Sequence, residues 1–188
     1  MSFKLPYDAE IEYLRGTGTQ WINTGINGGN LVTVEIKAIF PYADDSKLFG
    51  YRINYMSARN IILASGDGNY YLDYGNNNQF SSGVDIDSNI HTFKLDKNNA
   101  YIDGVLTNTY PAQTFTGGNM YLFACNQNGN VNGATKATVY YTKILINDIL
   151  VRDFIPVRVG NVGYMYDKVS KQLFGNAGTG EFILGPDR

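Results

Sequence analysis

The chain has 188 residues and a net charge of −2, with 21 glycines, 15 tyrosines and 10 phenylalanines but one cysteine and one histidine. This length suits a single all-β domain spanning residues 1–188, which needs no disulfide or structural metal to fold. No run of basic residues is present, which argues against nucleic acid as a partner. No stretch reaches the ~18 apolar residues of a membrane-spanning helix, so we expect no membrane insertion.

Apolar and polar residues alternate along the chain, whereas the 3.6-residue period of helices does not recur. Gly50 is expected to break one strand, and Asp67-Gly68 is typical of a two-residue hairpin turn. Residues 76–78 and 84–89 read as turns. In the first half of the chain, the pattern predicts strands over residues 10–14, 31–40, 46–53, 61–65 and 70–74.

The second half predicts turns at Asn98-Asn99, Asp103-Gly104 and Asn147-Asp148, a polar loop over residues 126–133, and a turn cluster at 176–180 that returns Phe182 to the body. We expect the two chain ends to pair beside each other and so to remove an exposed sheet edge. Many short strands joined by turns indicate a two-sheet antiparallel sandwich or a barrel. The predicted strands here are 91–96, 99–103, 105–110, 121–125, 134–146 and 149–157.

Residues 91–104 contain His91-Thr92-Phe93-Lys94-Leu95 and, after a turn, Tyr101-Ile102-Asp103-Gly104. This double hairpin resembles the hallmark of the laminin G-like branch of the concanavalin A-like lectin/glucanase superfamily. The opening AEIEYLRGTGTQWINTGI and the tail RDFIPVRVGNVGYMYDKVSKQLFGNAGTGEFILGP resemble a subgroup found in gut bacterial surface proteins and in structural or tail-associated proteins of their phages. The resemblance implies a jelly roll of two antiparallel sheets, with ligands on a concave sheet face or its rim loops.

Retaining glucanases of that superfamily place carboxylates on one strand face, as Glu-x-Asp-x-Glu or Glu-x-Asp-x-x-Glu, about 5–5.5 Å apart. No such string occurs here. Glu10 and Glu12 have the right alternation, but they lie near the N-terminus with no intervening aspartate. Asp85 and Asp87 also alternate, but they read as the start of a turn. The sequence therefore favours a protein that is not an enzyme, and a glycoside hydrolase is the least favoured alternative.

Few residues suit a cofactor or metal. Cys125 lies in an apolar strand and reads as a buried thiol, and His91 resembles a structural histidine that is hydrogen-bonded and partly buried. One histidine cannot build a zinc site without cysteine partners. Asp44, Asp45 and Asp67 supply the hard oxygens that calcium prefers, so they are weak candidates for a rim Ca²⁺ site; solvated turn acids are the alternative.

Aromatic and polar residues gather in segments 51–60 and 69–74. Sugar rings stack on tyrosine and tryptophan faces, while Asn, Asp and Arg bind hydroxyls. In a strand, Tyr71 and Asp73 share one face and Tyr70 and Tyr74 the other, so only one of these tyrosine sets faces out unless both sheet faces are covered. Packing in the core is the alternative for each ring. The candidate ligand-binding residues are Tyr51, Arg52, Tyr55, Arg59, Tyr70, Tyr74 and Trp21.

These features together predict a non-catalytic lectin-like module that binds glycans at a cell or virion surface. The alternative is a structural or protein-interaction domain of a phage tail or surface assembly, which predicts oligomeric contacts and no exposed aromatic groove. The opening MSFKLPYDAEIEYL lacks the apolar segment of a signal peptide. We therefore expect either no export by that route or a chain that begins after a leader.

Overall fold

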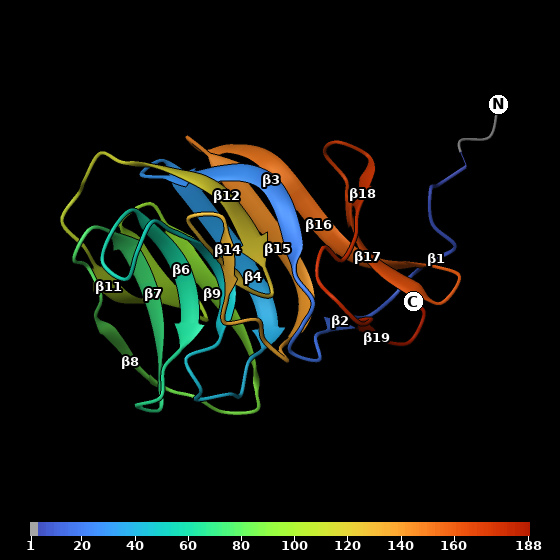
Figure 1. Ribbon diagram of the computed structural model, residues 1–188, viewed down its shortest axis with the longest axis horizontal. Coiled ribbons are helices and arrows are strands. Elements are labelled where there is room, and N and C mark those ends of the chain that lie inside the picture. The colour runs from blue at the N-terminus through green and yellow to red at the C-terminus, as the bar shows by residue number, and fades with distance from the viewer. Residues whose placement is uncertain (1–3) are drawn as a thin grey trace.

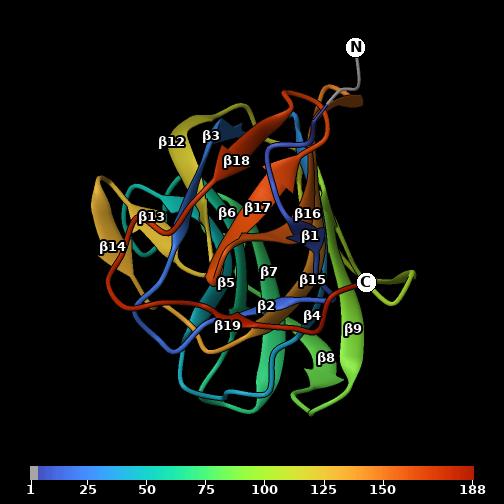
Figure 2. The same cartoon turned by 90° about the vertical axis from the view of Figure 1, so that its right-hand side faces the viewer.

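The computed structural model describes residues 4–188, and none of these residues is helical. They form two β-sheets that pack face to face around one main core, which confirms the predicted all-β sandwich. Figure 2 shows the two layers, with β9 and β15 in one and β5, β6 and β7 in the other. No helix long and apolar enough to cross a membrane occurs in the described part of the chain.

One layer, the large sheet, has a main path of eight strands in which each neighbour pairs antiparallel. Two short strands near the N-terminus and one near the C-terminus extend it: β1 (Ala9–Glu10) pairs with β16, and β2 (Leu14–Arg15) pairs with both β15 and β19 (Ile183–Leu184). The path runs β11 (Val105–Thr109), β10 (Asn99–Ile102), β9 (Ile90–Asp96), β4 (Val32–Ile39), β15 (Thr138–Ile146), β16 (Ile149–Val159), β17 (Val162–Asp167) and β18 (Gln172–Phe174).

The other layer, the small sheet, is centred on two strands, β5 (Lys47–Arg52) and β6 (Arg59–Ala64). β12 (Thr116–Leu122) pairs with β5 and with β3 (Ile22–Gly29). Pairing is antiparallel except where β13 runs parallel to β5. The remaining strands are β7 (Asn69–Gly75), β8 (Ser81–Asp85), β13 (Cys125–Gln127) and β14 (Asn130–Asn132).

Three tyrosines of the core pair their hydroxyls with backbone carbonyls. Tyr70 donates to the carbonyl of Phe40 at 3.1 Å, and Tyr110 donates to the carbonyl of Leu72 at 2.6 Å. Tyr74 donates to the carbonyl of Gln113 at 3.1 Å. A buried phenol needs such a partner because losing water without a replacement bond costs free energy. Strand alternation therefore places these rings inside at little polar cost.

The segment 91–104 forms the predicted antiparallel ribbon, and the structure gives its motif a physical reason. Asp103 and Gly104 both have positive φ, 52° and 77°, as a tight hairpin turn of this class requires. The Asp103 carboxylate accepts from Thr92 N at 2.8 Å and lies 2.6 Å from His91 Nδ1. His91 Nε2 also lies 2.9 Å from Asp87, so the expected hydrogen-bonded, partly buried histidine is confirmed.

The predicted strand over residues 10–14 is divided into β1 and β2, and β1 pairs with β16 near the C-terminus as expected, since Glu10 faces Val157. Besides the β2–β19 pairing, Arg188 N donates to the Glu10 carbonyl at 2.9 Å. The loop 176–180 returns the chain to the body, where the Phe182 ring lies 4.7 Å from that of Phe123. In Figure 1 β1 and the C-terminus lie at one end of the molecule and β6, β7 and β8 at the other.

Two predicted turns are displaced. Asn99 pairs with Asp96, so the turn is Lys97-Asn98 rather than Asn98-Asn99, and Lys97 adopts φ 53°. The Asp67-Gly68 hairpin has a three-residue rather than a two-residue loop: Ser65 N donates to the Asn69 carbonyl, and Gly68 supplies the left-handed residue at φ 90°. Turn-forming residues locate a reversal well, but strand pairing fixes its register.

Three other predictions need correction. Gly50 does not break β5; it permits close approach of β6, since a Cβ there would lie 2.1 Å from the Asn60 carbonyl oxygen. The polar segment 126–133 is largely the β13–β14 hairpin rather than a loop. Asp85 ends strand β8, which the sequence pattern did not predict.

Candidate functional site

The outer face of the small sheet is unusually buried. A sheet with one solvated face alternates buried and exposed residues, yet every residue of β5 and β6 is buried. The outward-facing side chains of Ile61, Leu63 and Cys125 form a small apolar cluster apart from the main core. We call the outward side of β5, β6 and β7 the covered face, because loops lie over it.

An ion pair lies within this covered face. Arg59 Nη1 of β6 is 3.2 Å from Asp73 Oδ2 of β7, and the two side chains are 0% and 1% exposed. Nε and Nη2 of Arg59 and Oδ1 of Asp73 have no hydrogen-bond partner within residues 4–188. Removing two charges from water costs more than one long contact returns, so this pair is an expensive feature for a sheet surface.

The loop between β5 and β6, residues 53–58, closes over the ion pair; we call it the roof loop. Its Tyr55 carbonyl accepts from Arg59 Nη1 at 3.2 Å, while the Tyr55 side chain is 60% exposed. The Tyr55 hydroxyl accepts from Gln79 Nε2 at 3.1 Å. The Arg52 guanidinium carbon lies 5.6 Å from the centre of the Tyr55 ring, within cation–π range.

Beside the roof loop is a pocket of about 180 Å³. Its walls combine an aromatic ring, cationic and amide groups and one apolar residue, the mixture that small-molecule sites use. The lining residues are Asp45, Lys47, Arg52, Tyr55, Leu63, Ser65 and Gln79.

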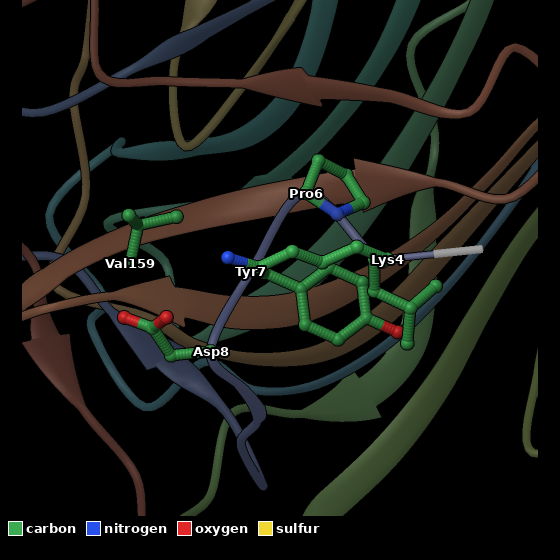
Figure 3. A pocket seen from close by; sticks show the side chains of 6 residues that line it. Lys4, Pro6, Tyr7, Asp8 and Val159 are labelled. Carbon is green, nitrogen blue, oxygen red and sulfur yellow. The ribbon is translucent and has the colours of Figure 1, made fainter. Parts of the chain in front are cut away.

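A larger hollow of about 420 Å³ lies at the N-terminal segment, where residues 4–8 and Val159 line it. Figure 3 shows Lys4, Tyr7 and Asp8 around this hollow. It is open to solvent and holds no buried charge, since its polar lining residues Lys4 and Asp8 are exposed and Tyr7 is half-buried. The pocket beside the roof loop is therefore the better candidate, although it is smaller.

Burial dominates the electrostatics of the covered face. It raises the pKa of Asp73 to about 7, although Arg59, Arg52 and Lys47 all act to lower it. Burial also lowers the pKa of Lys47, and the neighbouring Arg52 adds to that effect. The pKa of Cys125 is raised to about 12, chiefly by burial, so the free thiol is protonated near neutral pH. The predicted buried thiol is confirmed.

The structure brings some candidate residues together and separates others. Arg52, Tyr55 and Arg59 meet at the covered face, as described above. Trp21 is half-buried, its ring stacked 4.2 Å from that of Tyr121 and in contact with the 176–180 loop. The other three candidates lie in the main core and offer no ring face to a ligand at the surface: Tyr51, Tyr70 and Tyr74.

The three weak calcium candidates each stabilise a turn. Asp44 accepts from the backbone N–H of Ser46 at 3.1 Å, and Asp45 accepts from that of Gly66 at 2.9 Å. Asp67 accepts from the Tyr71 hydroxyl at 2.6 Å. Among residues 4–188, no three acidic, histidine or cysteine side chains gather as a metal site would require.

Sequence reasoning did not select Lys47, Asp73 or Gln79 as site residues. Alternation along β7 did place Asp73 on the same face as Tyr71, opposite the Tyr70 set. That signal could have identified Asp73, because a carboxylate on a tyrosine-bearing strand face needs a partner. Neither a scan of protein-family models nor a search of curated proteins gives a match to this chain.

Proposed function

We propose that this protein is a non-catalytic carbohydrate-binding module of the laminin G-like, concanavalin A-like kind, acting at a cell or virion surface. The observation that carries the proposal is the pocket where Arg52, Tyr55 and Gln79 converge on the outer side of the small sheet. Residues 91–104 resemble a laminin G-like motif, and that resemblance implies a ligand on a sheet face or its rim loops. A pocket on the outer side of the small sheet agrees with that expectation.

The chemistry of the pocket suits a sugar. The exposed Tyr55 ring offers a face for sugar C–H groups, and the surrounding guanidinium, amide and carboxylate groups bind hydroxyls. Its volume of about 180 Å³ is below the roughly 300–1,000 Å³ of drug-sized sites, so it accepts about one sugar ring. One ring in an open pocket makes few contacts, so we expect a Kd of roughly millimolar to micromolar.

A glycan array followed by titration calorimetry tests the proposal. We expect the wild-type protein to bind a restricted set of glycans and Tyr55→Ala to weaken binding about tenfold, since stacking contributes about 1 kcal/mol or more. Tyr101→Ala is the matched control, because Tyr101 lies in the large sheet far from this pocket. Binding that survives Tyr55→Ala but not Tyr101→Ala would contradict the assignment, as would an array with no bound glycan.

One observation favours the protein-interaction alternative. Leu31, Ile149 and Leu150 are 45%, 67% and 40% exposed, and the turns that carry them are adjacent, since Asn147 N donates to the Leu31 carbonyl. Clustered exposed apolar residues mark interaction surfaces. Sedimentation across a range of concentrations tests this: self-association that Ile149→Ser abolishes supports the alternative, and a monomer at every concentration opposes self-assembly through this surface.

A further inference from the structure

Arg59 has an unused hydrogen-bonding edge within the covered face. Its Nη1 donates to Asp73 and to the Tyr55 carbonyl, both at 3.2 Å. Its Nε and Nη2 have no partner within residues 4–188, although both atoms are buried. These two N–H groups point along one side of the guanidinium fork, the geometry with which arginine binds a carboxylate through two parallel hydrogen bonds.

The neighbouring cations are already engaged. Arg52 Nε donates to Gln127 at 2.9 Å and its Nη2 donates to Asn132 at 3.1 Å, so the same edge of that guanidinium is occupied. Lys47 Nζ donates to the backbone carbonyl of Asp45. Among the described cations of the covered face, Arg59 therefore keeps the free fork, and Arg52 and Lys47 add positive charge around it.

The cations of the covered face outnumber its buried carboxylates, although Asp45 also lines the pocket. Three cations, Lys47, Arg52 and Arg59, act on the single buried carboxylate of Asp73. Burial raises the pKa of that carboxyl, which lessens its negative charge near neutral pH. Asp73 Oδ1, on the carboxylate that pairs with Arg59 Nη1, is itself an unpartnered acceptor. The complementary ligand is an anion that also has a hydroxyl donor.

The roof loop separates this ion pair from the pocket and is weakly anchored. The side chains of residues 53–56 are exposed, and Ala58 is the residue of this loop that packs in the main core. Its ties to the chain after β7 are three hydrogen bonds, from Asn77 N to the Met56 carbonyl, from Gln79 to the Tyr55 hydroxyl and from Ala58 N to Asn76 Oδ1. Segments with few buried contacts open at low free-energy cost.

We propose that the pocket binds a carboxylated sugar, with its carboxylate on Nε and Nη2 of Arg59 and a hydroxyl donating to Asp73 Oδ1 once the roof loop lifts. This inference rests on the proposed function and names the ligand class of the same site. The sugar ring then lies in the pocket that Tyr55 and Leu63 help to line. Arg59 selects the ligand, and the roof loop shields the ion pair when no ligand is bound.

The first test uses the wild-type chain and free sugars. Saturation-transfer NMR and calorimetry compare D-glucuronate, D-galacturonate and N-acetylneuraminate with D-glucose, D-galactose and D-glucose 6-sulfate. We expect at least one carboxylated sugar to bind about tenfold or more tightly than the neutral sugars, as a charge-assisted hydrogen bond provides. Equal or tighter binding of the sulfate ester would overturn the carboxylate assignment.

The second test asks whether Arg59 is the group that gives the preference for carboxylated over neutral sugars. Arg59→Lys keeps the charge but loses the fork, and it should abolish the carboxylate preference. The matched control Arg158→Lys, at a surface arginine that pairs with Asp187 outside this pocket, should retain it. In case Arg59→Lys does not fold, the Arg59 Nε–H resonance of the wild-type protein should shift on adding the carboxylated sugar. An unchanged resonance would overturn the inference. Neutral sugars that bind through Tyr55 without a carboxylate preference leave the proposed function standing and refute only this inference; no sugar binding refutes both.

Discussion

On the outer face of the large sheet charged side chains stay in water, whereas on the covered face of the small sheet they are buried. Lys94 lies 3.7 Å from Asp96, and both are about one-third exposed. Arg59 lies 3.2 Å from Asp73 with neither exposed. The solvated pair Lys94–Asp96 changes the free energy of unfolding little, whereas the buried pair Arg59–Asp73 carries a desolvation cost. The difference indicates that the small sheet retains its ion pair for a reason other than stability.

The aromatic residues of the two faces also differ in their surroundings. On the large sheet, Lys94 lies 5.9 Å from the Tyr101 ring centre and Lys143 lies 5.5 Å from that of Tyr141, so these cations already have partners at the surface. On the small sheet, Tyr55 contacts Arg52 while most of its ring remains exposed. The exposed ring next to buried charge is what distinguishes the candidate site.

The largest expected effect separates the two faces of β7. Tyr70→Ala should lower the free energy of unfolding by about 3–5 kcal/mol, because it removes a large ring from the core. Its neighbour Tyr71 faces outward and is partly exposed, so Tyr71→Ala should cost about 1 kcal/mol. Urea denaturation measures both, and similar losses would mean that the faces are assigned the wrong way round.

The buried ion pair should respond non-additively. Arg59→Leu or Asp73→Leu alone should lower the free energy of unfolding by about 3–5 kcal/mol, because each leaves an uncompensated buried group. The double substitution should regain most of that loss, since it removes both desolvation costs. A double-mutant cycle in urea gives the coupling. Two losses that simply add would show that the two groups do not depend on each other.

A pH-dependent effect of intermediate size is expected at His91. Burial alone would lower its pKa, but hydrogen bonds to Asp103 and Asp87 outweigh burial, so the pKa is raised. A raised histidine pKa stabilises the fold fully below the unfolded value near 6.5 and loses that stabilisation as pH rises through the folded pKa. His91→Gln should therefore cost roughly 1 kcal/mol more at pH 5.5 than at pH 8.5. A difference that grows toward high pH would contradict this sign.

The smallest effect is expected on the large sheet. Lys94→Ala should change the free energy of unfolding by less than about 1 kcal/mol, because its ion pair with Asp96 is solvated. Salt should erase even this difference, since exposed charges are screened. Thermal melts at low and high ionic strength provide the measurement. A loss as large as that of Arg59→Leu would remove the contrast between the two faces.

Much of the fold could be predicted from alternation and turn residues. The strands β4, β9 and β10 lie close to their predicted ranges because alternate apolar residues of each face one core, whereas β15 begins four residues later than predicted. The β13–β14 hairpin could not be predicted: its strands are three residues long and polar. Pairing with β5 and hydrogen bonds to Arg52 support it, and these are tertiary contacts.

The candidate site could be predicted only in part. The sequence indicated that the two tyrosine sets of β7 face opposite ways, but alternation does not say which face is inside. The enrichment of segment 51–60 singled out Arg52, Tyr55 and Arg59, which the structure brings together at the covered face. It also selected Tyr51, which packs inward because a register shift lies between Lys47 and Phe49 of β5. Burial of the Arg59–Asp73 pair depends on the roof loop, which no local pattern reveals.

The pairing of β2 with β19 has a mechanical consequence. Leu14 faces Leu184 and Ile11 faces Asp187, so the two ends of the chain leave this ladder on the same side. A force that pulls the two ends apart therefore breaks the hydrogen bonds between β2 and β19 one after another. It does not load all of them in shear at the same time.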